Sequence, residues 1–485
     1  MPNFWDIPEL VHSVVSFLSK SDQASLARVN RQLWLMAVPE IWRAVPDFRY
    51  FFLLLPADLC LWSSDIESYP ASLRRQIHTS DYDRLLLHSR FTKNLHYKVE
   101  TAIFGVPAEI WNLETMSMAF PHLQSLDVSV TPWATPRQTV ILSPFLRPTL
   151  RKLVFSSELG QFTRTLRTIS QTPTLSLQEI ELNCFEGFGD LGEPARHVIL
   201  SQEGLRRITI YSLGDVTDLV HAAKKLPCLT HLDVKRLWPA PEWANNRGDQ
   251  EDGPERYFRS LVSLRVSGIP AGIIYLLETI KSNGITEIMV ELEDFTAEWM
   301  PRDTLLALDA FKATLINLEV QIPAQFTWDL LEPTLGLDRL QQFSLTYSTP
   351  TISPQVTDSR LLQMTRAWPQ LTSLHLSNYS KTPTITLVGL GYIASNCQKL
   401  RLLSVAFDGT RPVDPSSLPA DDLLLEQSVM ERVDVLHSRY KKGDELKITT
   451  SFFRRWWPCA RIVASDMSRD EANEWEHASA ASGTA

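Results

Sequence analysis

The stretch Leu371-Thr372-Ser373-Leu374-His375-Leu376 has apolar side chains at its first, fourth and sixth positions. The same spacing occurs in twelve hexamers, and their first positions lie 24 to 32 residues apart. Their first, fourth and sixth residues are Leu123/Leu126/Val128, Leu150/Leu153/Phe155, Leu177/Ile180/Leu182, Leu205/Ile208/Ile210, Leu229/Leu232/Val234, Leu261/Leu264/Val266, Ile285/Ile288/Val290, Leu315/Leu318/Val320, Leu340/Phe343/Leu345, Leu371/Leu374/Leu376, Leu400/Leu403/Val405 and Met430/Val433/Val435. A looser copy, Thr92/Leu95/Tyr97, precedes them by 31 residues. Self-similarity at such a period predicts a stack of structural repeats.

The spacing has a physical reason. The fourth and sixth residues are two apart, so a β-strand directs both side chains to the same face, and the first residue fills the core beside them. One unit cannot bury its own apolar edge, whereas stacked units share one core. The pattern resembles the core of leucine-rich repeats. We therefore predict an α/β fold, a leucine-rich-repeat solenoid (a horseshoe) of about 12 to 13 irregular repeats with helices on the outside.

Composition limits the class of protein. A length of 485 residues predicts more than one compact unit, and 44% hydrophobic with 21% charged residues is typical of a soluble globular protein. The net charge of -9 argues against a nucleic-acid partner. Five scattered cysteines without a Cys-x-x-Cys motif favour a reducing, intracellular (cytoplasmic or nuclear) location. The longest apolar run, residues 50–55, is too short to span a membrane, so we expect no membrane partner.

Residues 5 to 43 differ from everything that follows. Their apolar residues recur at helical spacing over Leu10, Val14, Phe17 and Leu18. Ser21 or Asp22 is expected to cap a second helix, and Pro39 is expected to end the helical pattern. We predict three short helices, which bury too little to be stable without a neighbour or a partner.

This segment resembles an F-box. The blocks that carry the resemblance are Ile7-Pro8-Glu9-Leu10, Phe17-Leu18, Leu26-Ala27-Arg28-Val29-Asn30-Arg31 and Ala37-Val38-Pro39-Glu40-Ile41-Trp42. Asn30 stands where the family often has cysteine, and Leu33 stands where it often has an aromatic residue. Together with the repeats, the chain resembles the F-box/leucine-rich-repeat proteins common in fungi.

The resemblance implies a substrate-recognition subunit of an SCF-type (cullin–RING) E3 ubiquitin ligase. The F-box would dock a Skp-type adaptor, and through it a cullin, while the repeats would hold a target protein. The residues that it implies for adaptor binding are Ile7, Pro8, Glu9, Leu10, Leu18, Leu26, Val29 and Trp42. The alternative is a repeat scaffold for protein interaction whose first helices only cap the solenoid, since a solenoid needs capped ends.

These patterns divide the chain into four parts. Residues 1–45 form the F-box-like module, 46–89 a helical connector, 90–465 the solenoid with its C-terminal cap, and 466–485 a disordered tail. Near the end, Trp456 and Trp457 follow two arginines and predict either a cap or a ring-stacking site, with the cap favoured.

No motif for catalysis, metal binding or a cofactor stands out, so the chain is not expected to be an enzyme. Gly187-Phe188-Gly189-Asp190-Leu191-Gly192 fits the Gly-x-Gly-x-x-Gly form of a dinucleotide loop, but it lies inside a repeat. Histidines and carboxylates are dispersed, without the spacing of catalytic or metal-ligand sets.

Target binding is expected on the strand residues that face away from the core. The charged candidates are Lys152, Glu179, Glu181, Arg206, Arg207 and Arg265. Two hypotheses remain open for them. They select a partner by complementary charge, or they pair with one another across neighbouring strands and contribute under about 1 kcal/mol each.

Overall fold

The structure is a computed structural model of the whole chain. It describes residues 7–62, 70–99, 110, 116, 118–130, 142, 144–157, 159–172, 175–184, 192–212, 216–237, 258–280, 284–293, 301–322, 328–347, 356–377, 383–411, 429–436, 438 and 444–463. Most of the Gly187–Gly192 loop and the predicted tail lie outside the described residues.

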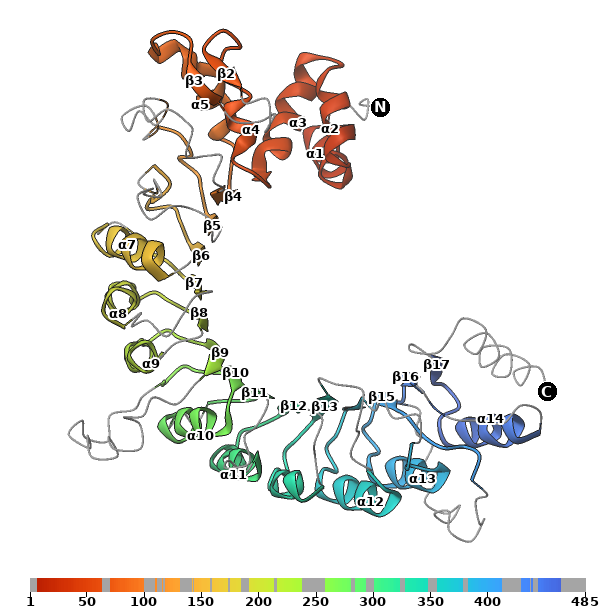
Figure 1. Cartoon of the computed structure of the whole chain (residues 1–485). Helices are drawn as coiled ribbons and strands as arrows, with labels where there is room; N and C mark the ends of the chain where they lie inside the picture. The colour runs from red at the N-terminus through yellow and green to blue at the C-terminus, as the bar shows by residue number, and fades with distance from the viewer. Residues whose placement is uncertain are drawn as a thin grey trace. The chain divides into compact units, whose positions relative to one another are not determined.

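The described residues include fifteen strands of one parallel sheet (Figure 1). The chain divides into two compact units, residues 1–229 and 230–485. The first unit contributes β1 (Ala44–Val45), β4 (Asn94–Val99), β5 (Ser125–Val130), β6 (Lys152–Ser157), β7 (Glu179–Cys184) and β8 (Arg207–Ser212). The second contributes β9 (His231–Leu237), β10 (Ser263–Gly268), β11 (Glu287–Leu292), β12 (Asn317–Ile322), β13 (Gln342–Tyr347), β14 (Ser373–Leu376), β15 (Leu402–Val405), β16 (Arg432–Asp434) and β17 (Arg461–Val463).

The repeated apolar positions form the core of this sheet. Every first, fourth and sixth residue of the twelve hexamers is at most 3% exposed. Neighbouring strands pair in parallel with the hexamers in register, so that Leu126, Leu153 and Ile180 stand side by side. Each fully buried leucine contributes roughly 2 kcal/mol relative to an exposed one. The predicted α/β stack of repeats is confirmed in strand order and core, and the horseshoe shape stays a prediction.

Helical segments follow several of the strands in each unit. In the first unit these are α7 (Leu159–Ser170), α8 (Gly192–Leu200) and α9 (Thr217–Ala223), which lie along one face of β6 to β8 (Figure 1). In the second they are α10 (Pro270–Thr279), α11 (Pro301–Leu306), η5 (Ala307–Phe311), η6 (Trp328–Leu330), η7 (Glu332–Gly336), α12 (Asp358–Ala367) and α13 (Leu387–Asn396). The opposite face of the strands, here called the open face, carries the polar residues of each repeat.

The N-terminal segment forms the three predicted helices, α1 (Pro8–Phe17), α2 (Lys20–Ala27) and α3 (Arg31–Arg43). Their shared core consists of Val11, Val15, Leu33 and Ala37. Leu33, one of the two departures from the F-box pattern, therefore has a packing role. Asn30, the other departure, accepts a hydrogen bond from the Leu33 backbone N–H at 2.8 Å and begins α3 as its N-cap.

Two predicted helix boundaries were wrong. Ser19, rather than Ser21 or Asp22, is the N-cap of α2, because its hydroxyl accepts from the Asp22 backbone N–H at 3.2 Å. Pro39 does not end α3, which continues to Arg43. Proline costs one backbone hydrogen bond, and packing of Ile41 on the helical core and of Trp42 on Phe51 compensates for that loss.

The connector is only partly helical, whereas the sequence predicts a helical connector. It contains α4 (Arg49–Phe52), an antiparallel hairpin of β2 (Cys60–Trp62) and β3 (Pro70–Leu73), η2 (Thr79–Tyr82) and α5 (Asp83–Ser89). Strand β1 follows α3 without an intervening residue and pairs with β4, Ala44 beside Asn94. These strands are two to four residues long, too short for an alternating pattern to reveal them.

An aromatic cluster joins the connector to the first repeats. Phe48 lies at its centre, with ring centroids 5.2 to 6.1 Å from its neighbours. Those neighbours are Phe51, Phe52, Tyr97, Phe120 and Phe145. All six rings are buried, so the end of the repeat core that faces the N-terminal helices is closed by aromatic packing.

The predicted C-terminal cap consists of α14 (Asp444–Trp456) and β17, which pairs with β16. Trp456 and Trp457 are buried, and the Phe453 ring lies 5.7 Å from that of Phe407 in the last repeats. This packing supports the capping hypothesis for these tryptophans, and the cap stays a prediction. Their burial removes the alternative of an accessible ring-stacking site.

Candidate protein-docking surfaces

Helix α1 exposes a row of apolar side chains. Leu10, Val14 and Phe17 are 46%, 41% and 87% exposed, whereas Val11 and Val15 on the same helix are fully buried. The spacings of four and three residues place the exposed three on one face of α1. We call them the α1 row. A contiguous exposed apolar face of this kind is a mark of an interaction site.

The structure distributes the predicted adaptor-binding residues unevenly. Leu10 is in the α1 row, Val29 lies two residues after α2 and is 68% exposed, and Glu9 is exposed. Ile7 and Leu18 are partly buried, and Leu26 packs on the core of the helices. The side chain of Pro8 lies outside the described residues. The prediction omitted Phe17 from its site although helical spacing had placed it on the apolar face.

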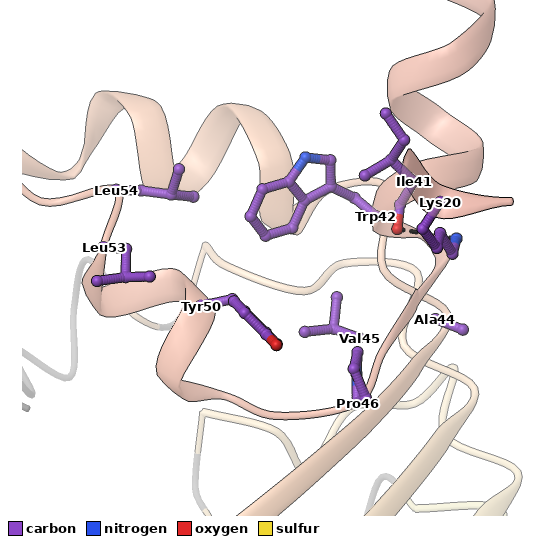
Figure 2. A pocket seen from close by; sticks show the side chains of 9 residues that line it. All are labelled: Lys20, Ile41, Trp42, Ala44, Val45, Pro46, Tyr50, Leu53 and Leu54. Carbon is purple, nitrogen blue, oxygen red and sulfur yellow. Dashed lines mark hydrogen bonds between the residues drawn. The ribbon is translucent and has the colours of Figure 1, made fainter. Parts of the chain in front are cut away.

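Trp42 lines a pocket and is not part of the α1 row. Its ring lies 5.2 Å from that of Phe51 and 4.8 Å from that of His88. The pocket has a volume of about 410 Å³. Figure 2 shows its lining side chains, which are Lys20, Ile41, Trp42, Ala44, Val45, Pro46, Tyr50, Leu53 and Leu54.

Lys20 is the single charged residue of that lining. Its ammonium group donates to the backbone carbonyl of Glu40 and, at 3.0 Å, to that of Ile41. These carbonyls belong to the last turn of α3, where a cation is favourable. Burial lowers the pKa of Lys20. Lys20 thus caps the C-terminal end of α3. Because the carbonyl of Glu40 is 20 residues away in sequence, local sequence patterns could not predict this role.

On the open face of the first unit, the predicted charges form a partly paired ladder. Lys152 Nζ lies 3.4 Å from Glu179 Oε2 across β6 and β7. Glu181 accepts a hydrogen bond from Asn183 at 2.9 Å. Arg206 and Arg207 are exposed, and Arg207 is in register with Glu179. Pairing thus accounts for Lys152 and Glu179, while a partner-selecting role stays a prediction for all five.

His96 on β4 and Asp127 on β5 stand next to each other at the start of this ladder. His96 Nδ1 lies 3.9 Å from Asp127 Oδ2 on the neighbouring strand. Burial raises the pKa of Asp127, and the nearby His96 opposes that shift. The two side chains line a second pocket of about 210 Å³ beside β1.

Arg265, the sixth predicted residue, lies in the second unit. It lines a depression of about 310 Å³ on the open face of β10 to β14, here called the strand hollow. Glu287, Met289, Asn317 and Glu319 line the same depression.

Among the described residues, no group of three or more His, Cys, Asp or Glu side chains is arranged to hold a metal ion. None of the helices described is long and apolar enough to cross a membrane.

No protein-family model matches the sequence. A comparison with curated proteins also gives no match. Among solved structures, a chain of the crystal structure of the Rad7 and Elc1 complex in yeast matches at 13% sequence identity, covering 89% of this chain and 88% of that chain with a TM-score of 0.32. A likeness at this TM-score carries no inference about function.

Proposed function

We propose that the chain is the substrate-recognition subunit of an SCF-type ubiquitin ligase. Its N-terminal helices dock a Skp-type adaptor, and through it a cullin, while the open face of the repeats holds a target protein. The chain itself performs no catalytic step. It acts by proximity, holding the target beside a ubiquitin-charged enzyme brought by the rest of the complex.

The observation that carries this proposal is the α1 row. Leu10, Val14 and Phe17 keep their side chains in solvent while the other face of α1 packs into the helical core. Leaving Phe17 almost fully exposed forgoes roughly 2 kcal/mol of burial, and a docked partner recovers that energy. The row also lies within the segment that resembles an F-box.

A pull-down with a purified Skp-type adaptor tests the proposal. The full chain is compared with a Leu10→Ser/Phe17→Ser variant, and Leu61→Ser/Met118→Ser serves as the control because it removes two other exposed apolar side chains. We expect the first variant to lose at least about tenfold in affinity, since it removes a central aromatic anchor. The control should bind like the unchanged chain.

The proposal is overturned if the unchanged chain, shown to be folded by circular dichroism, does not bind the adaptor. It is also overturned if both variants bind as the unchanged chain does.

The second candidate function is a repeat scaffold whose helices serve as a cap. It is favoured by β1, which continues directly from α3 into the sheet, and by the aromatic cluster that closes the repeat core. A cap and a docking module are compatible in one segment. For a scaffold without an adaptor, the α1 row has no function, and the Leu10→Ser/Phe17→Ser variant leaves all binding unchanged.

A further inference from the structure

The strand hollow has the dimensions of a site for a short extended peptide. Its lining comes from five neighbouring strands, β10 to β14, which pair in register. Strands about 4.8 Å apart make this row about 19 Å wide. A fully extended segment of about six residues covers that distance.

The hollow carries unpaired negative charge. Glu287 and Glu319 line it, and Glu291 lies on the same face of β11. Of the residues that the structure describes, none forms an ion pair with these three carboxylates. The positive lining residue, Arg265, is in register with Asp233 on β9, so an opposite charge stands beside it.

The side-chain amide of Asn317 lies next to the carboxylate of Glu287. Its Nδ2 donates to Glu287 Oε1 at 3.2 Å, an orientation that chemistry requires because an ionised carboxylate only accepts hydrogen bonds. The amide Oδ1 is consequently turned away from Glu287. It is buried and has no hydrogen-bond partner among the described residues.

Met289 gives the hollow an apolar centre. It stands in register between Arg265 on β10 and Glu319 on β12. Methionine is flexible and polarisable, and it packs well against alkyl chains. Lysine and arginine have this combination of an apolar stem and a cationic donor head, so the stem fits Met289 and the head fits Glu287 and Glu319.

We propose that the strand hollow binds a basic segment of the target protein, with a lysine or arginine side chain seated between Glu287 and Glu319. The inference rests on the proposed function, since it names the chemistry of the target that the repeats hold. Phosphate groups of a nucleic acid would be repelled by the same carboxylates, so the occupant is a protein segment.

Fluorescence anisotropy on the full chain tests this inference. The probe is a labelled, acetylated and amidated peptide of alternating lysine and alanine, beside the same peptide with glutamate in place of lysine. The test variant is Glu287→Gln/Glu319→Gln. The matched control is Glu278→Gln/Asp303→Asn, which removes the same charge from exposed positions on α10 and α11.

We expect the lysine peptide to bind the unchanged chain and the control equally, and to bind the test variant about tenfold more weakly, the loss that two ion pairs produce. The glutamate peptide should not bind. Equal weakening by both variants would mean attraction by net charge alone and would overturn the inference, as would unchanged affinity of the test variant or absence of binding.

The adaptor pull-down keeps the two proposals separable. Glu287 and Glu319 lie in the second unit and the α1 row in the first, so the test variant retains adaptor binding if the proposed function holds. Peptide binding without adaptor binding would leave the hollow as the site of a scaffold.

Discussion

At the scale of single residues, Arg75 links the β2–β3 hairpin to the turn before α5. Its Nη1 and Nη2 donate to the two carboxylate oxygens of Asp81 at 2.7 and 2.8 Å, and its Nε donates to Asp58 at 2.8 Å. Asp81 also accepts from the His78 backbone N–H at 2.8 Å. A bidentate pair of this kind fixes both the charge and the direction of the side chains.

This pair predicts an acid-dependent loss of stability. The hydrogen bonds from Arg75 lower the pKa of Asp81 to about 2, whereas an aspartate in the unfolded chain titrates near about 3.9. Because the folded pKa is the lower one, the stabilisation is fully present above about pH 4 and is lost as the pH falls towards about 2.

We expect the urea midpoint of an Asp81→Asn variant to lie below that of the unchanged chain at neutral pH. The gap should narrow as the pH falls from about 4 towards 2. Asp83→Asn, at an exposed position of α5, serves as the control. A gap that stays constant over this range would contradict the assigned role of Asp81.

At the scale of elements, the end of β10 requires a glycine at position 268. It has a φ of 146°, and the pairing of β10 with β9 shifts register between Val266 and Gly268. A Cβ atom there would lie 2.3 Å from the Leu237 carbonyl oxygen. Only glycine combines this backbone conformation with so close an approach.

A Gly268→Ala variant should therefore lose on the order of 2 to 3 kcal/mol of unfolding free energy, through strain and displacement of β9. Gly204→Ala is the matched control, because its Cβ would meet the Leu177 carbonyl oxygen at an ordinary 3.7 Å. Urea denaturation compares the two. If both variants lost the same unfolding free energy, the end of β10 would not require glycine.

The elements also show what the sequence could reveal. The hexamers predicted the long strands, because each buried pair such as Leu374 and Leu376 repeats the same local spacing. Contacts between distant residues left no such pattern. Gln23, for example, is buried and donates to the Val15 and Leu18 carbonyls at 2.8 and 3.2 Å, satisfying the end of α1.

The docking residues were predictable only in part, for the same reason. Helical spacing places Leu10 and Phe17 on one face of α1 but does not tell whether a neighbour covers that face. Trp42 was assigned to the adaptor-binding set, yet it packs on Phe51 and His88 of the connector. Burial depends on the fold around an element, which local spacing does not contain.

At the scale of the whole molecule, a stack of repeats depends on its ends. At the C-terminus, α14 and β17 cover the last repeat through Phe453 and Trp457, both buried. Without them, β16 would become an unpaired edge beside exposed apolar side chains, and such edges promote association between chains.

A chain truncated after Leu436 should therefore form larger species than the full chain in size-exclusion chromatography with light scattering, and it should unfold at a lower temperature. A chain truncated after Val463 retains α14 and β17 and is the control. If the shorter truncation keeps both the size and the unfolding temperature of the control, the cap is dispensable.

The direct passage from α3 into β1 has a further consequence for a partner held by the α1 row. Arg43 ends α3, Ala44 begins β1, and the Phe48 backbone N–H donates to the His96 carbonyl at 2.9 Å. A flexible tether would let the bound partner sample many distances and would average its effective concentration over them. Here no loop separates α3 from β1, and β1 is hydrogen-bonded to β4, so a partner bound on α1 would keep a restricted orientation relative to these two strands.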